Sequence, residues 1–227
     1  MRIKYLLIAI LCLFMTACAS NNYDSGDASR GGQASADQLY KQGMKYARGI
    51  GGVQQDDEKA VQYLQAAAKM GQPKAQYALG YMYRSGRGVE RNYAVAQQWL
   101  EKSAGQGNAY GQYSTGMRYL LGQGVSVDYS KAKSLLEQAA SQNNPYAENE
   151  LGYMYMSGLG VSQDYPQGFQ WYQRAAEHGL PSAQYNLGMM YVKGLGTPVD
   201  KASARVWFKK ASARGFAPAR VALTQYA

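Results

Sequence analysis

The sequence is poor in the side chains that most often carry chemistry. Its 227 residues include one histidine, His178, and two cysteines, Cys12 and Cys18. These three residues cannot build a zinc or iron–sulfur centre, because such sites need about four His or Cys ligands. Any Ser–His–Asp or Cys–His catalytic centre would depend on His178 alone, which we expect in a solvent-facing turn. We therefore expect a protein that is not an enzyme, with no cofactor and no metal.

Proline is also scarce, with 6 residues, whereas glycine (26), tyrosine (21) and methionine (10) are abundant. Apolar residues make up 46% of the chain and charged residues 17%, which is typical of a globular protein rather than a disordered one. The combination indicates helices that are separated by glycine turns.

The N-terminal residues have the features of an export signal. Residues 1–17 begin with the basic Arg2 and Lys4 and continue with an apolar run that is too short to span a bilayer. The sequence Met15-Thr16-Ala17-Cys18 resembles a bacterial lipobox, in which the cysteine is lipidated and becomes the mature N-terminus. The alternative is an ordinary signal peptidase site beside an incidental cysteine. We expect a lipoprotein signal peptide over 1–17 and lipidation of Cys18.

The following segment is short of residues that can be buried. Residues 18–35 hold the expected lipidated cysteine and a tract of Ser, Gly, Asn, Asp and Ala, which predicts a flexible tether. Ala19 follows the cysteine where an Asp would retain an enterobacterial lipoprotein in the inner membrane. We therefore expect an outer-membrane anchor, with residues 36–227 as one domain facing the periplasm. No other segment is apolar over the length of a membrane span.

From residue 36 the sequence repeats itself about every 36 residues. Each unit carries a glycine, then a tyrosine three residues later, then a second glycine three residues further on. The first glycines of the five units are Gly43, Gly80, Gly116, Gly152 and Gly188. An Asp or Asn follows, then an aromatic residue or Leu, and an Ala-rich stretch closes the unit. The later polar positions are Asp56, Asn92, Asp128, Asp164 and Asp200.

One unit reads as two helices joined by a turn. In the second unit Ala75, Leu79 and Tyr83 share one face of a helix, because they lie at i, i+4 and i+8. The glycine beside Leu79 would allow a second helix to approach closely, and Asn92 fits the N-cap of that helix. Ala96 and Trp99 are then expected to be buried against the first helix. Such a pair cannot bury its apolar stripe alone, so successive pairs must stack.

The tracts LGYMYRSGRGVERNYAVAQQWLEKSAGQG (79–107) and LGYMYMSGLGVSQDYPQGFQWYQRAAEHG (151–179) resemble Sel1-like repeats, which are related to tetratricopeptide repeats. The resemblance covers roughly residues 37–227. It implies an all-α fold, in which αα-hairpins form a right-handed superhelix that serves as a protein-binding scaffold. The third repeat departs most, with Thr115 and Asn143 at places of Leu and Gly. Residues 219–227 match the start of a sixth first helix and are expected to form a terminal cap.

A second stripe on the first helices lies away from the expected core and is rich in tyrosine and methionine. In related repeats this helix lines the concave surface, so we expect a groove there that binds a partner protein. Tyr and Met suit such a groove because they offer large, adaptable contact areas. The alternative is burial of these residues by the adjacent helix pair. The candidate residues are Tyr77, Tyr81, Arg84, Tyr110, Tyr113, Met117, Tyr146, Asn149, Tyr153, Tyr185 and Met189.

Charge provides a second candidate surface. The chain has a formal net charge of +9, and loss of Arg2 and Lys4 leaves +7. The last repeat has a net charge of +5, and its basic patch consists of Lys201, Arg205, Lys209, Lys210 and Arg214. Such a patch could attract an acidic partner, anionic lipid or cell-wall polymer, or it could be a solvated face that aids solubility. The cluster of Arg84, Arg87 and Arg91 has the same two interpretations. We do not expect nucleic acid as a partner of an exported lipoprotein.

The leading hypothesis is a non-catalytic scaffold that binds one envelope protein. An alternative is an immunity protein, because Sel1-like lipoproteins are known to neutralise antibacterial type VI secretion effectors such as lipases. A further alternative is a surface-exposed factor that binds a host protein. An enzyme that acts on cell-wall glycan or β-lactams has weak support, because the Cys-rich relatives linked to β-lactams have paired cysteines that this chain lacks. The sequence leaves the partner and the oligomeric state open.

Overall fold

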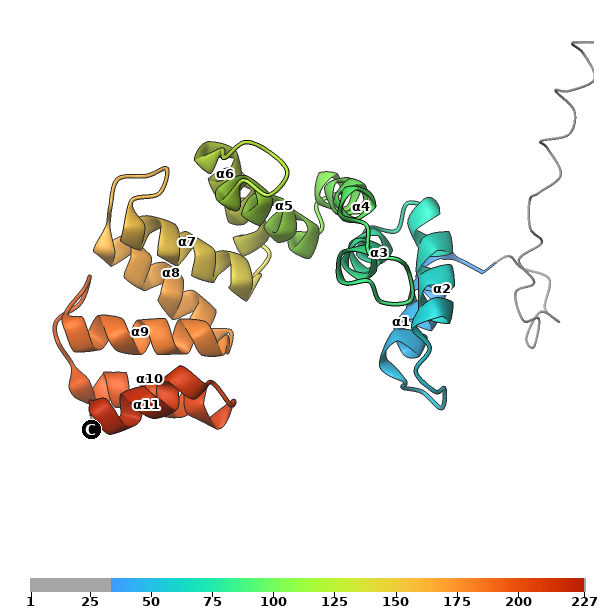
Figure 1. Ribbon diagram of the computed structural model, residues 1–227. Helices are drawn as coiled ribbons and strands as arrows, with labels where there is room; N and C mark the ends of the chain where they lie inside the picture. Colours follow the sequence, from blue (N-terminus) through green and yellow to red (C-terminus); the bar gives the residue numbers. More distant parts are fainter. Residues whose placement is uncertain (1–33, 227) are drawn as a thin grey trace, which may run out of the picture. The chain divides into compact units, whose positions relative to one another are not determined.

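The computed structural model describes residues 34–226, which form eleven α-helices and no β-strand (Figure 1). The predicted all-α class is therefore confirmed for this part of the chain. The expected signal peptide and Cys18 lie outside the described residues, as does nearly all of the expected tether. None of the described helices is both long enough and apolar enough to cross a membrane.

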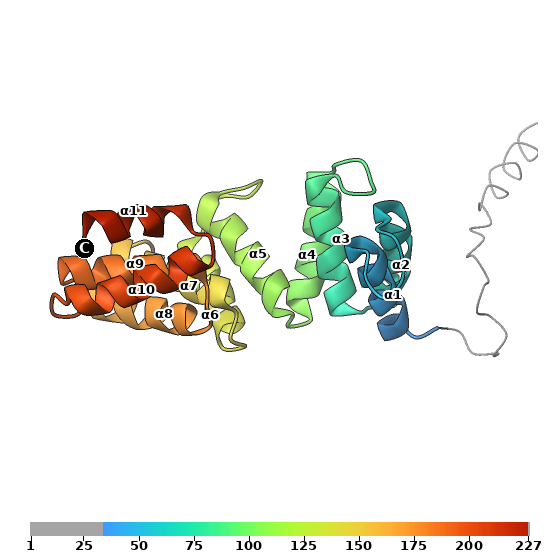
Figure 2. The same cartoon turned by 90° about the horizontal axis from the view of Figure 1, so that it is seen from below.

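The helices alternate between two kinds, called A helices and B helices here. The A helices are α1 (Ala36–Arg48), α3 (Pro73–Ser85), α5 (Ala109–Leu121), α7 (Pro145–Ser157), α9 (Pro181–Lys193) and α11 (Ala217–Gln225). The B helices are α2 (Asp57–Lys69), α4 (Tyr93–Gly105), α6 (Tyr129–Ala140), α8 (Tyr165–Glu177) and α10 (Lys201–Ala213). Each B helix packs against the A helix before it and the A helix after it, so the hairpins stack in chain order (Figures 1 and 2).

The helix ends follow from the repeated polar and glycine positions. Asn92 is the N-cap of α4, and its side-chain oxygen accepts a hydrogen bond from the backbone N–H of Val95. Asp56, Asp128, Asp164 and Asp200 cap the other B helices in the same way. A glycine in the left-handed conformation ends each of the first five A helices, as Gly86 does with a φ of 71°. The predicted caps and turns are confirmed.

Each hairpin is closed by contact between the first glycine of its A helix and one large residue of its B helix. A Cβ atom on Gly80 would lie 2.8 Å from Leu100 Cγ and 3.0 Å from the Ala96 carbonyl oxygen. Only glycine therefore allows α3 and α4 to pack this closely. The equivalent B-helix residues are all buried, and they are Leu64, Leu100, Leu136, Tyr172 and Phe208.

The expected burial of Trp99 is corrected by the structure, which buries Leu100 at 3% exposure and leaves Trp99 half-buried. Successive helical residues point about 100° apart, so only one of the two can face Gly80. The tryptophan instead lies at the edge of the core, where Lys102 Nζ is 4.5 Å from its ring centroid. Arg174 lies over the Trp171 ring and Lys210 over the Trp207 ring in the same way. These rings thus join apolar packing on one side to a cation on the other.

The predicted terminal cap is confirmed as helix α11. Ala219 and Ala222 are buried against Phe208 of α10, and the Tyr226 ring stacks on Phe208 with the centroids 6.3 Å apart. Thr224, which replaces the glycine of the other A helices, is exposed. The last complete hairpin is therefore covered by a helix rather than left open to solvent.

Candidate partner-binding surface

The tyrosines of the predicted stripe link successive A helices. Tyr77 of α3 contacts Tyr110 of α5 with ring centroids 5.4 Å apart, and Tyr113 of α5 contacts Tyr146 of α7 at 5.7 Å. Tyr185 of α9 contacts Phe208 and Phe216 in turn. Tyr77, Tyr113 and Tyr185 are half-buried, so these three residues hold the repeats together as well as border the surface.

Burial perturbs the inner members of this row. It raises the pKa of Tyr113 to about 12, with a smaller contribution from the negative charge of Glu150. Burial also raises the pKa of Tyr77 and of Glu150 above their usual values. The Tyr113 hydroxyl is therefore neutral at physiological pH and can act as a hydrogen-bond donor or acceptor to a partner.

The outer members of the stripe are open to solvent. Tyr81 is 41% exposed and Tyr153 is 47% exposed, while Tyr110 and Tyr146 are exposed to a similar extent. Met117 and Met189 are half-buried. Asn149, at the place where the leading Tyr is missing, donates to Glu150 Oε1 and accepts from Asn186 Nδ2 at 3.2 Å. It therefore bridges α7 and α9 by hydrogen bonds where other repeats use rings.

Grooves lie between successive A helices, and the predicted stripe borders them. The α1–α3 groove, of about 250 Å³, is lined by Met44, Ala47, Arg48, Leu64, Tyr77, Ala78, Tyr81, Met82 and Arg87. The α7–α9 groove, of about 340 Å³, is lined by Tyr153, Met156, Ser157, Tyr165, Tyr172, Asn186, Met189, Met190, Lys193 and Leu195. Both use equivalent positions of the repeat. A partner that lies along the A helices would therefore meet similar hollows in succession.

The largest of these grooves is lined mainly by α4 and α5, with Arg84 from α3, and is called the α3–α5 groove here. The α3–α5 groove, of about 620 Å³, is lined by Arg84, Tyr93, Ala94, Ala96, Gln97, Leu100, Ser114, Met117, Arg118, Gln123 and Gly124. The structure thus brings the predicted Arg84 and Met117 together. It adds Arg118, which was not among the residues singled out from the sequence.

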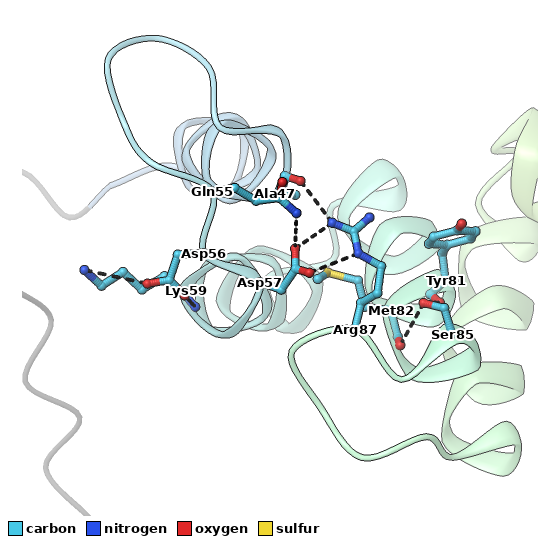
Figure 3. A network of polar contacts seen from close by, with 9 residues as sticks. All are labelled: Ala47, Gln55, Asp56, Asp57, Lys59, Tyr81, Met82, Ser85 and Arg87. Carbon is cyan, nitrogen blue, oxygen red and sulfur yellow. Dashed lines mark hydrogen bonds and ion pairs between the residues drawn. The ribbon is translucent and has the colours of Figure 1, made fainter.

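Arg87, one of the residues that line the α1–α3 groove, is the centre of a charged network (Figure 3). Arg87 donates to both carboxylate oxygens of Asp57, with its Nη2 2.6 Å from Oδ1, and Nη2 also donates to the Ala47 carbonyl (Figure 3). These hydrogen bonds hold the pKa of Asp57 below its usual range. Arg87 thus joins α1, α2 and the turn after α3. The other two members of the predicted arginine cluster lie over rings, Arg84 over Tyr81 and Arg91 over Tyr93.

The five residues of the predicted basic patch fall into two groups in the structure. Lys201, Arg205 and Lys209 are exposed at i, i+4 and i+8 and so share one face of α10. Lys210 lies over the Trp207 ring at 3.9 Å, and Arg214 donates to the Gly179 carbonyl oxygen. Two of the five residues therefore have local structural roles. The other three remain a prediction as a partner-binding surface.

His178 is exposed, as expected, but it is not without a partner. Its Nδ1 lies 2.7 Å from Oε2 of Glu148, whose side chain is completely buried. Arg174 Nη2 lies 3.0 Å from Oε1 of the same carboxylate, close enough for an ion pair but without hydrogen-bond alignment. The preceding repeats have a glutamine pair at these places, Gln76 with Gln106 at 2.7 Å and Gln112 with Gln142 at 2.8 Å. The histidine thus belongs to a repeated contact between the two helices of a hairpin.

The fold and the grooves define a class of protein, a solenoid of helical hairpins with a row of inter-repeat surfaces. The family model for the Sel1 repeat matches residues 39–72, 73–108, 109–144, 145–180 and 181–216. The chain belongs to the Sel1 repeat family, whose repeats generally form non-catalytic scaffolds for protein–protein interaction. Within residues 34–226, no three His, Cys, Asp or Glu side chains are grouped to hold a metal ion.

Solved structures show the same architecture. A Sel1 repeat protein from Oxalobacter formigenes is 31% identical, with a TM-score of 0.76, over 83% of this chain and 74% of that one. A protective antigen of uropathogenic Escherichia coli with an SLR fold is 38% identical, with a TM-score of 0.71. The match covers 83% of this chain but spans only 40% of the antigen.

A more distant neighbour is an immunity protein from Pseudomonas aeruginosa. It is 21% identical, with a TM-score of 0.54, over 82% of this chain and 68% of that one. At this identity the likeness shows the fold alone. No curated protein sequence matches the chain significantly.

Proposed function

We propose that the chain is an outer-membrane lipoprotein that faces the periplasm and binds a partner protein along its A helices, without catalysis. The observation that carries this proposal is the recurrence of equivalent grooves between successive A helices, bordered by exposed tyrosines and half-buried methionines. Tyrosines such as Tyr81 and Tyr153 offer large contact areas with little loss of side-chain entropy, as at the centres of many protein interfaces. Membrane attachment rests on the lipobox-like sequence ending at Cys18.

Two alternatives concern the identity of the partner rather than the surface. An immunity role, in which the partner is an antibacterial type VI effector, draws on the immunity protein that shares the fold. A role at the cell surface, with a host protein as partner, draws on the 38% identical E. coli protein, which is a protective antigen. The identity of a crosslinked partner separates a toxin, a host protein and an envelope component.

Photo-crosslinking in intact cells tests the proposed surface. We expect a photo-reactive residue at Tyr81 or Tyr153 to give the same dominant adduct, because both side chains are exposed beside grooves. Gln98 and Gln170 are matched controls, since they are exposed on the B helices of the same two repeats. We expect the Tyr81→Ser, Tyr153→Ser double variant to bind the captured partner about 10- to 100-fold more weakly, because aromatic anchors each contribute more than about 1 kcal/mol. Adducts only at the Gln98 and Gln170 positions would place the site on the B helices.

The membrane anchor has its own test. We expect the Cys18→Ser protein to lose incorporation of an alkynyl fatty acid and to leave the membrane fraction, because acyl chains supply about 0.8 kcal/mol per buried CH₂ group. The Cys12→Ser protein is the control, since Cys12 lies within the expected signal peptide. Protease treatment of intact cells then reports the face, and we expect the domain to be protected. Unchanged labelling of the Cys18→Ser protein would contradict lipidation at this residue.

A further inference from the structure

Two arginines depart from the repeat pattern and line the same groove. Arg118 of α5 occupies the place of Met82, Met154 and Met190, each of which is buried in its own repeat. Arg84 of α3 occupies a place where the other four repeats have apolar residues, namely Ala47, Leu120, Met156 and Val192. Both departures meet in the α3–α5 groove. A charged residue at a position that is apolar in most of the other repeats does not improve the packing of the core, so such a departure indicates a binding role.

The guanidinium of Arg118 is only partly satisfied by the protein itself. The residue is 8% exposed, its Nη1 donates to Glu101 Oε1 at 2.9 Å, and its Nε donates to the Gln123 carbonyl at 3.3 Å. Its Nη2 is buried with no hydrogen-bond partner. Such an unpaired buried donor on a charged group is costly, and an external acceptor would remove that cost.

The charge of the groove is one-sided. Its lining includes Arg84 and Arg118 but no Asp or Glu. Arg84 is exposed, and no carboxylate of the described residues forms an ion pair with it. Within residues 34–226, Arg118 forms an ion pair with Glu101, whose side chain is 44% exposed. Glu101 lines a different hollow, between α4, α5 and α6. The groove therefore presents cationic donors, and no acidic residue belongs to its own lining.

The backbone is also more open at this junction. The turn glycine after α3, Gly88, packs so closely on the carbonyl oxygen of Asp57 that an added Cβ would overlap it. Gly160 and Gly196 meet the preceding B helix equally closely. At Gly124, the equivalent residue beside the α3–α5 groove, the nearest atom to an added Cβ is Gln97 Oε1 at 3.8 Å. The larger volume of this groove thus coincides with a wider gap between turn and helix.

We propose that the α3–α5 groove receives an acidic side chain, Asp or Glu, from an exposed segment of the partner protein. Its carboxylate accepts from Arg84 and from Nη2 of Arg118 once that guanidinium turns toward the groove, while Tyr93 and Met117 contact the apolar residues on either side. Planar guanidinium groups match carboxylate geometry and form charge-assisted hydrogen bonds. This inference rests on the proposed protein-binding function and names the chemistry that one groove selects.

The test uses the full-length protein and short synthetic peptides with blocked ends, which carry a central Asp, Asn or Lys among mixed apolar and small residues. We expect the Asp peptides to bind at least about 10-fold more tightly than the Asn peptides, and the Lys peptides not to bind. The Arg118→Met and Arg84→Met proteins should each lose this preference. Arg220→Met, at an exposed arginine of α11 outside both candidate surfaces, is the control that should keep it.

Melting temperatures distinguish a binding role of Arg118 from a structural one. Met is the residue of the second, fourth and fifth repeats at the Arg118 position, and the first repeat has Lys45 there. Arg118→Met should therefore melt at the same temperature or higher while it loses the Asp preference. Glu101→Gln should tighten the Asp peptides, because it removes the internal carboxylate that competes for Arg118. A lower melting temperature for Arg118→Met with an unchanged preference would overturn the proposal and make Arg118 a structural residue.

Two other results would also overturn the inference. The first is equal binding of the Asn and Asp peptides. The second is that a further set of the same peptides, made with a free C-terminal carboxylate, binds while the blocked Asp peptides do not. Neither result would contradict the proposed function as long as crosslinking at Tyr81 and Tyr153 still captures one partner. Loss of those crosslinks, with the Asp preference retained, would instead overturn the proposed function while leaving the groove's carboxylate preference in place.

Discussion

Replacing Gly88 by alanine is expected to lower the free energy of unfolding by about 3 kcal/mol. Two causes add at this residue. Its φ of 66° is a left-handed conformation that a side chain disfavours by about 1–2 kcal/mol. The new Cβ would also overlap the backbone of Asp57, which cannot move away without shifting the start of α2. The shift would disturb the ion pair between Arg87 and Asp57 that Figure 3 shows.

Gly124→Ala is the matched control, because this glycine has nearly the same φ, 71°, and the same place in the repeat. It lacks the close backbone neighbour, so we expect a loss of only about 1 kcal/mol. Urea unfolding followed by circular dichroism measures both variants in the Cys18→Ser background. Equal losses would show that the turn before α4 gives way as easily as the one beside the α3–α5 groove, and would contradict the difference in openness on which the carboxylate inference partly depends.

Most of the fold could be predicted from the sequence because the same cap and glycine positions recur in all five repeats. Asn92 and its equivalents had to be caps, since Asp and Asn satisfy free backbone N–H groups at helix starts. Gly80 and its equivalents had to mark a close helix contact, which the structure confirms. The choice between Trp99 and Leu100 could not be made in the same way. Tryptophan is large and apolar but has a polar edge, and the structure places it where a cation covers the ring.

The candidate surface was harder to predict, because it depends on contacts between repeats. The tyrosines all looked alike in sequence, yet Tyr113 is half-buried between A helices and Tyr81 is exposed. Arg118 was not predicted as a surface residue because it lies one position from the predicted stripe. Its burial depends on the packing of α5 against α4. The signal was present, since a charged residue stood where the other complete hairpins after the first have methionine. His178 likewise aligns with Gln106 and Gln142, whose partners lie 30 residues earlier.

The buried carboxylate of Glu148 yields the second large effect expected on stability. In α3 the equivalent residue, Gln76, donates to the Ala68 carbonyl at 3.2 Å and accepts from Gln106. A carboxylate cannot donate, and Arg174 instead donates to the equivalent carbonyl, that of Ala140, at 3.3 Å. The fourth repeat has thus replaced a neutral hydrogen-bond relay by an ion-pair network around a fully buried acid. Such networks depend on every member, because a charge left alone in the interior is costly.

We therefore expect two substitutions of Glu148 to differ in their effect on stability. Glu148→Ala should lower the free energy of unfolding by about 2–3 kcal/mol, since it leaves a cavity and removes the partner of Arg174 and His178. The loss is kept below that of a fully buried pair because both partners are more than a third exposed. Glu148→Gln should stay within about 1 kcal/mol of the parent, because the introduced amide can donate to the Ala140 carbonyl as Gln76 does to Ala68. Urea unfolding distinguishes the two, and a Glu148→Gln loss as large as that of Glu148→Ala would mean that the charge itself stabilises the fourth repeat.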